Sequence, residues 1–204
     1  MVLFISKVIS SVIEIIALSL IPFIWWLVTA RKKEGFFNWL GIKTIDKLKV
    51  KKVLGISAVV EVSFILLSFY MLYAVKGVEN LATSDFSGLG IKVLPAILVY
   101  AIFNTALPEE IFFRGFLLKR LSNKFGFGVG NFVQCVAFGL MHGLMFVKYT
   151  GLFTGIAITL FTEAIAWFMG YVNEKKADGS ILPSWGIHAV ANIFSGLVAA
   201  LSLI

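Results

Sequence analysis

Residues 108–115 read PEEIFFRG, which places two glutamates and an arginine inside one of the most apolar stretches of the chain. An ionisable side chain in a membrane span is costly, and it usually faces the interior of a helical bundle or a water-filled cavity. Whether these three charges lie in a membrane depends on the chain around them. The stretch therefore bears on the fold as well as on the chemistry.

The composition of the 204 residues is that of a membrane protein. Hydrophobic residues make up 59% of the chain and mean hydropathy is +0.95, whereas soluble domains contain roughly 45–50% apolar residues. A span needs about 20 mostly apolar residues, and six stretches qualify: about 8–30, 53–75, 93–120, 128–147, 152–172 and 181–203. Because lipid offers the backbone no hydrogen-bond partners, we predict an all-α, polytopic transmembrane helical bundle of about six to seven membrane helices.

Little of the chain remains for a soluble domain, so we predict one integral membrane domain over residues 1–204. Its motif-bearing core covers about 93–203, and helices at about 8–30 and 53–75 precede this core. A basic cluster follows the first apolar run instead of preceding it, so we expect a retained helix and not a signal peptide. The single cysteine, Cys135, excludes an intramolecular disulfide and is expected to be a small buried hydrophobic residue.

The distribution of Lys and Arg predicts the orientation of the chain. Segment 31–52 carries eight of the 18 basic residues, and the positive-inside rule places it in the cytoplasm. If the spans alternate from there, 14 basic residues lie inside and four lie outside, namely Lys7, Lys76, Lys92 and Lys148. Both termini are then expected outside. The net charge of +7 is explained by this orientation and by contact with anionic membrane lipids, so it requires no nucleic-acid partner.

The three charges of the opening stretch divide into a pair and a single acid. Glu110 and Arg114 have i,i+4 spacing with the acid on the N-terminal side, which is the favourable order for an ion pair. Glu109 points about 100° away from Glu110 and is free to act as a general base. Pro108 leaves two interpretations open: a kinked membrane helix, or a separate cytoplasmic helix that begins at the proline with acids in its first turn.

Both histidines of the chain, His142 and His188, lie in predicted spans. Phe138 precedes His142 by one turn and Asn192 follows His188 by one turn, so each pair shares a helix face. A carboxylate and one imidazole could polarise a water while a second imidazole and an amide stabilise the oxyanion that forms. Glu and His are also ordinary zinc ligands. The spacing alone does not choose between these two chemistries.

The ordered series Glu109-Glu110-x-x-x-Arg114, Phe138-x-x-x-His142 and His188-x-x-x-Asn192 resembles the CPBP family, the CAAX proteases and bacteriocin-processing enzymes that are also called the Abi family. The resemblance implies an intramembrane endopeptidase, with a peptide or a prenylated CAAX-type protein as its substrate. Six spans in a short chain look more like a bacterial or archaeal member, in the plasma membrane, with an active site reached from the cytoplasm.

The resemblance also implies a role for each motif residue. Glu109 and His142 activate water, Glu110 and Arg114 form a supporting ion pair, and His188 and Asn192 stabilise the oxyanion. The family was first proposed to be metalloproteases and is now read as glutamate-type. The resemblance therefore favours a site with no metal and no other cofactor over a zinc site.

Two rival classes remain open. A transporter or channel could use the same residues as a proton relay, although no inverted repeat is visible. A non-catalytic bacteriocin-immunity or scaffolding protein of the same fold would act by contact. Among the other acids within spans, Glu14, Glu61 and Glu163, we favour Glu163 for a cavity role.

A shared water requires Glu109, His142 and His188 to lie at one level of the membrane. Counted from the predicted cytoplasmic ends of their spans, His142 lies about 14 residues deep and His188 about 7, a mismatch of roughly 10 Å. Helix tilt or a later start to the fourth span would remove this mismatch.

Overall fold

The computed structural model describes residues 1–75 and 81–203, and in these ranges six helices are long and apolar enough to cross a membrane. They are α1 (Val2–Thr29), α3 (Lys47–Ala74), a third-span helix (Ile91–Phe125), α7 (Phe127–Thr150), α8 (Leu152–Lys176) and α9 (Leu182–Ala200). The described residues contain no strand. The predicted all-α bundle with six spans is thus confirmed.

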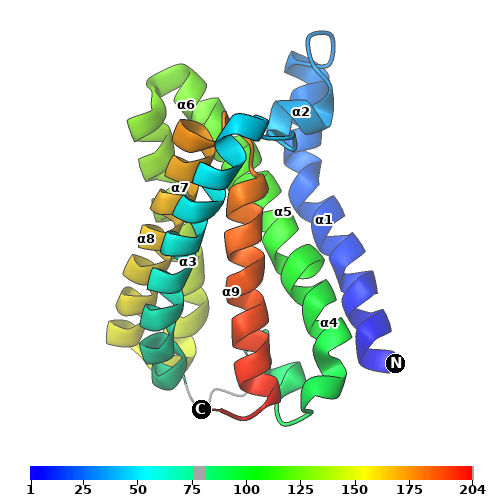
Figure 1. The fold of residues 1–204 in the computed structure, drawn as a ribbon, viewed down its shortest axis with the longest axis vertical. Coiled ribbons are helices and arrows are strands. Elements are labelled where there is room, and N and C mark those ends of the chain that lie inside the picture. The colour runs from blue at the N-terminus through cyan, green and yellow to red at the C-terminus, as the bar shows by residue number, and fades with distance from the viewer. Residues whose placement is uncertain (76–80, 204) are drawn as a thin grey trace.

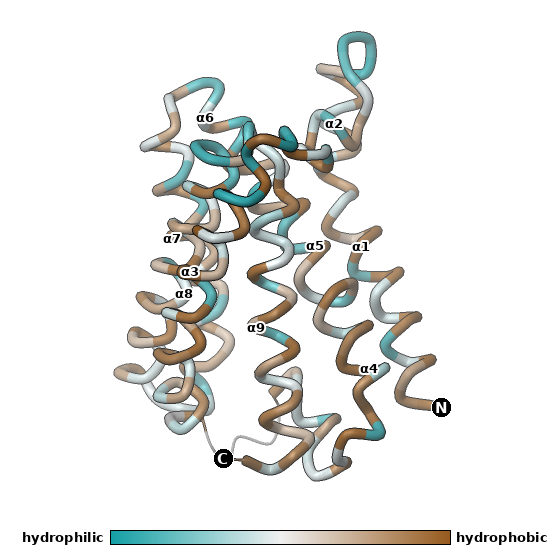
Figure 2. The backbone as a smooth tube through the Cα atoms, in the orientation of Figure 1, coloured by the Kyte–Doolittle hydropathy of each residue, from teal (hydrophilic) through white to brown (hydrophobic). Residues whose placement is uncertain are grey.

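The basic segments gather at one end of the bundle. Figure 1 shows α2 (Phe36–Leu40), α6 (Lys119–Phe125) and the start of α3 at that end, and both termini at the opposite end. Figure 2 shows hydrophilic residues concentrated around α2 and α6, above apolar helices. Three of the four cations expected outside occur at helix ends on the side of the termini, while Lys76 lies outside the described residues. Which end faces the cytoplasm stays a prediction.

The third-span helix is continuous, but its turns are not uniform. It runs through α4 (Leu94–Val99), a wide π-helical stretch (Tyr100–Ala106), α5 (Leu107–Glu110), a second π-helical stretch (Ile111–Leu118) and α6. Pro108 lies inside it, so the interpretation of a separate helix beginning at the proline is wrong. A proline has no N–H and its ring collides with the carbonyl of residue i−4 in a regular helix. The wide turn before Pro108 accommodates this ring.

Side chains from α9 compensate for this irregular backbone. The indole N–H of Trp185 donates to the carbonyl oxygen of Ile102 at 2.9 Å. The amide of Asn192 donates to Thr105 Oγ1 at 2.7 Å, and the Thr105 hydroxyl donates to the carbonyl of Tyr100 at 3.1 Å. Helix-breaking residues are tolerated in membranes where neighbouring helices satisfy the freed backbone groups in this way. The contacts also hold α9 against the third-span helix.

The connection between α8 and α9 is buried, and this sets the depth of His188. Ser180 and Ile181 are fully buried. The N–H of Ile181 donates to the carbonyl of Gly41 at 2.9 Å, and the Ser180 hydroxyl donates to that of Lys43 at 2.7 Å. The α2–α3 linker (residues 41–46) therefore lies over the start of α9, and Figure 1 shows α9 beginning below the upper ends of α6 and α8. This recess removes the predicted depth mismatch, although α7 does not start later than expected.

Small residues let α7 and α8 approach closely. A Cβ atom added at Gly139 would lie 2.7 Å from the carbonyl oxygen of Thr159, and one added at Gly143 would lie 2.7 Å from that of Gly155. Both distances are too short for a side chain, so the α8 backbone occupies this space. Cys135 is 5% exposed in the same helix, which confirms its predicted burial.

We predict that Gly41→Ala destabilises the protein by about 1–2 kcal/mol or more, because Gly41 adopts φ +86°, a left-handed conformation that is costly for L-residues. The new Cβ would also meet the carbonyl oxygen of Gly179 and lie 2.7 Å from Lys119 Cε. Thermal unfolding in detergent would measure the loss. Gly35→Ala is the control, since its φ is −69° and nothing lies within 4 Å of its added Cβ. Equal melting temperatures for the two variants would contradict the assigned role of Gly41.

Candidate active site

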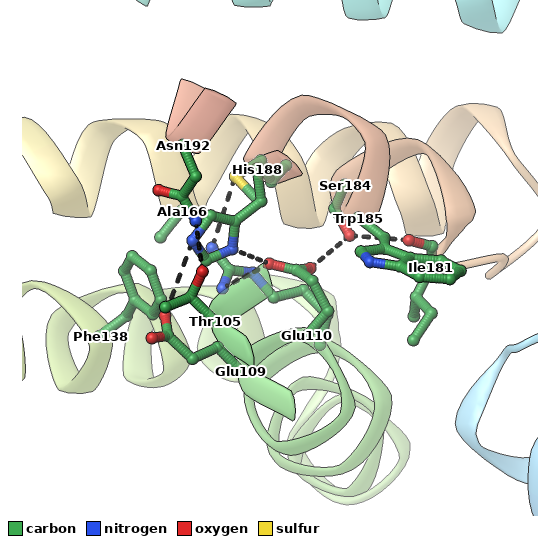
Figure 3. A network of polar contacts seen from close by, with 12 residues as sticks. Thr105, Glu109, Glu110, Phe138, Ala166, Ile181, Ser184, Trp185, His188 and Asn192 are labelled. Atoms are coloured by element: carbon green, nitrogen blue, oxygen red, sulfur yellow. Dashed lines mark hydrogen bonds and ion pairs between the residues drawn. The ribbon is translucent and has the colours of Figure 1, made fainter. Parts of the chain in front are cut away.

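Glu110 joins three polar side chains of the site, and its own side chain is 0% exposed. Its Oε1 lies 3.0 Å from Nη1 of Arg114, which is likewise 0% exposed. The same oxygen accepts a hydrogen bond from Nδ1 of His188 at 3.1 Å, and Oε2 accepts one from the Ser184 hydroxyl (Figure 3). The ion pair predicted from the i,i+4 spacing is thus present, and it joins the third-span helix to α9.

Arg114 depends on Glu110 for charge compensation. Its guanidinium carbon lies 4.3 Å from the centre of the Phe138 ring, and Nη2 is 3.6 Å from the weakly accepting sulfur of Met169. Nε and Nη1 have no aligned hydrogen-bond partner among the described residues, so the contact with Glu110 is an ion pair rather than a directed hydrogen bond. Removing one member of such a pair leaves an uncompensated buried charge.

Ser184 and Asn173 extend the network, and the sequence analysis missed both. Asn173 Nδ2 donates to Ser184 Oγ at 2.7 Å, and Asn173 Oδ1 accepts the backbone N–H of Ser184 at 3.2 Å. Both side chains are fully buried. Ser184 precedes His188 by four residues and therefore shares its helix face, which is a signal that the spacing did contain. Asn173 belongs to α8, a different helix from Ser184, so the spacing of residues within one helix could not reveal this contact.

Glu109 lies between the two imidazoles. Its Oε2 is 4.0 Å from Nε2 of His142 and 3.7 Å from Nε2 of His188, and it has no hydrogen-bond partner among the described residues. These separations exceed a direct hydrogen bond, and polar groups at such distances are commonly joined through water. The three groups meet at one level, as a shared water requires, while their chemical roles stay predictions.

The hydrogen bond between His142 and the backbone of Phe138 determines which ring nitrogen of His142 carries the hydrogen and which one can accept a hydrogen bond. Nδ1 lies 2.9 Å from the carbonyl oxygen of Phe138, which only accepts, so Nδ1 carries the hydrogen. In the neutral ring, Nε2 then has a free lone pair directed toward Glu109. A water between them would donate one hydrogen to the carboxylate and one to this nitrogen. The lone pairs of its oxygen would remain available for attack on a carbonyl carbon.

His188 and Asn192 are positioned differently from a simple pair of oxyanion donors. His188 gives its Nδ1–H to Glu110, so donation from Nε2 to an oxyanion requires the imidazolium form. One amide hydrogen of Asn192 is used by Thr105, and the second is the one left for an oxyanion. Thr105 was not found from the sequence, because a threonine in an apolar run has no distinguishing spacing.

Phe138 holds the two imidazoles in place. Its side chain is 4% exposed, and its ring centre lies 4.3 Å from that of His142 and 5.9 Å from that of His188. The His188 contact is edge-on, an arrangement that aromatic pairs favour. Phe138 thus contacts both imidazoles and the Arg114 guanidinium, which makes its role one of positioning.

Within residues 1–75 and 81–203, no group of three or more His, Cys, Asp or Glu side chains is placed to hold a metal ion. Glu109, His142 and His188 are donor types that zinc accepts, and the expectation of a site without a metal stays a prediction. Of the other membrane acids, Glu61 is 8% exposed, whereas Glu163 is partly exposed. The structure therefore draws attention to Glu61 rather than to Glu163.

The site thus gathers a carboxylate, two imidazoles and a buried ion pair within a helical membrane bundle. The family model described as type II CAAX prenyl endopeptidase Rce1-like matches residues 91–194, which is just over half of the chain. The chain therefore belongs to this family, and every motif residue of the site lies within the match. No curated protein and no solved structure matches the chain significantly.

We predict that Ser184→Ala lowers the free energy of unfolding by about 1–3 kcal/mol, because it leaves buried polar groups of Glu110 and Asn173 without a partner. Thermal unfolding in detergent measures this loss. Ser63→Ala is the control, since Ser63 is exposed on α3 and its hydroxyl donates only to the carbonyl one turn earlier. A Ser184→Ala protein as stable as Ser63→Ala would contradict the role of Ser184 in the network.

Proposed function

We propose that this protein is an intramembrane endopeptidase that hydrolyses a peptide bond of a membrane-associated substrate of the prenylated CAAX type. The observation that carries the proposal is the convergence of Glu109 Oε2 on Nε2 of both His142 and His188, at 4.0 and 3.7 Å. Membership of the CAAX endopeptidase family supports the same reaction.

The geometry supports a glutamate-type mechanism. Glu109 accepts a proton from the water that it shares with His142 as the water oxygen attacks the scissile carbonyl carbon. Imidazolium His188 and the free amide hydrogen of Asn192 donate to the oxyanion of the tetrahedral intermediate. When the C–N bond breaks, the proton held by Glu109 passes to the leaving amine. Arg114 and Glu110 keep the ring of His188 oriented through its Nδ1–H.

An apolar cavity beside the site suits a lipidated substrate. It has a volume of about 230 Å³ and lies between α3, α7, α8 and α9. His142 contributes to its wall together with aromatic side chains: Phe64, Phe146, Phe161 and Phe194. Such a space accepts a hydrocarbon chain and would hold the adjoining peptide bond close to His142. We propose that it receives the lipid part of the substrate.

The orientation completes the proposal. The basic end of the bundle, with α2 and α6, faces the cytoplasm and contacts anionic lipid, and both termini face outward. The site is then reached from the cytoplasmic side of a plasma membrane. Membrane lipids and a prenylated protein or peptide are the partners that this placement requires.

We predict that Glu109→Gln lowers the rate of cleavage by about 100-fold or more, because the amide cannot accept the proton of the water. Purified protein in liposomes would be incubated with farnesylated C-terminal peptides and with unmodified apolar peptides, and the products identified by mass spectrometry. Glu14→Gln is the matched control, since Glu14 is an exposed acid within α1. Full activity of Glu109→Gln would overturn the proposal.

Metal dependence is tested in the same assay. Activity that persists in a strong chelator supports the glutamate-type mechanism, and activity that is lost and then restored by zinc contradicts it. Cleavage of no peptide by the wild type would favour the non-catalytic immunity or scaffolding class instead.

A further inference from the structure

A second cavity, of about 430 Å³, lies between α3 and α9. Its lining on α9 includes Pro183, Gly186, Ile187 and Val190. Ser184, His188 and Asn192 of the same helix instead make their hydrogen bonds to the third-span helix. This cavity and the catalytic site therefore lie on different sides of α9. Because Ile187 and His188 are consecutive, the part of this cavity that Ile187 lines is at the level of the His188 imidazole.

The deep end of this cavity carries two polar groups without partners. Both carboxyl oxygens of Glu61 and the hydroxyl of Ser57 are buried and make no hydrogen bond to any described residue. Glu61 is 8% exposed, and Ser57 precedes it by one helical turn, so both side chains point into the same space. A buried carboxyl group without a partner is costly. A ligand with a cationic, hydrogen-bonding group would remove that cost.

The face of α3 that lines the cavity continues to two cations at the start of the helix. Lys47 and Lys51 are exposed. Successive residues in the series Lys47, Lys51, Leu54, Ala58 and Glu61 are three or four positions apart, so all five share one face of α3. Lys49, by contrast, is paired with Asp178 at 2.6 Å. The face of α3 along the cavity thus runs from two cations at the membrane surface, past aliphatic side chains, to an acid at depth.

We propose that this cavity binds a short apolar peptide as a zwitterion, with its ammonium group on Glu61 and its carboxylate toward Lys47 and Lys51. The inference rests on the proposed function, because cleavage of a CAAX-type C-terminus releases such a peptide. Hydrolysis creates the new amine beside His188, whose chain neighbour Ile187 lines the same cavity as Glu61. The original C-terminal carboxylate completes the zwitterion.

The dimensions agree with a peptide of about three residues. Lys51 and Glu61 are ten residues apart on α3, or about 15 Å along the helix axis, and three extended residues span about 10–11 Å. The lysine side chain covers the remainder. A lipid fits less well, because it would place its polar group at the surface and its apolar tail at depth. Here polar groups occupy both ends and aliphatic groups the middle.

The experiment measures binding of the tripeptide Val-Val-Leu with free termini to the full chain in lipid nanodiscs, by calorimetry. Forms with an acetylated N-terminus or an amidated C-terminus are the ligand controls. We expect each blocked form to bind about tenfold more weakly or worse, since each loses a charge pair in a partly buried site. Glu61→Gln should weaken binding of the free peptide by a similar factor.

Gly186→Leu provides an independent variant that fills the cavity. Gly186 lines the cavity and nothing lies within 4 Å of a Cβ added there, so we expect the leucine side chain to occupy the cavity and binding to be lost. Gly55→Leu is the matched control, because its Cβ also has open space and Gly55 does not line the cavity. Equal binding of free and blocked peptides, or unchanged binding by Gly186→Leu, would overturn the inference.

Cleavage of farnesylated peptide is measured on the same preparations. Cleavage without tripeptide binding would refute the second site and leave the peptidase proposal standing. Binding without cleavage would support the site and refute the proposed function.

Discussion

The arrangement of this protein depends on one buried ion pair. Glu110 and Arg114 are both fully buried in a helix long and apolar enough to cross a membrane. Removing either partner would leave the other as an unpaired buried charge, which costs about 3–5 kcal/mol of stability. The carboxylate still has capacity to accept hydrogen bonds after pairing with arginine, and Ser184 and His188 of α9 fill it. The pair therefore both neutralises the membrane charge and fixes where α9 packs. His188 acquires its orientation as part of the same contact.

The fold could be predicted largely from hydropathy, because spanning helices must satisfy their own backbone and so reveal themselves as long apolar runs. The positions of α7 and α8 follow this rule closely. The depth of α9 does not, since it comes from a buried connection whose partners, Gly41 and Lys43, are about 140 residues earlier in the chain. The wide turn before Pro108 escaped prediction for a related reason: Ile102 and Thr105 within it accept hydrogen bonds from Trp185 and Asn192, which belong to another helix.

The candidate site was predictable where its residues share a helix face. The spacings of Glu110 with Arg114 and of Phe138 with His142 identify contacts that the structure contains. Uncharged residues were harder to find, because serine, threonine and asparagine occur in spans for many reasons. Ser184 lies one turn before His188 and could have been noticed, whereas Asn173 and Thr105 join the site only through packing between helices.

The α2–α3 linker also limits how the matched region could be transplanted. The family match covers residues 91–194, yet the depth of His188 is set by Gly41 and Lys43, which lie outside it. The part of the chain that the family shares is thus not a self-sufficient module. Grafting the matched region onto foreign N-terminal helices would therefore remove the segment that holds the start of α9, and His188 would lie at a different depth from His142.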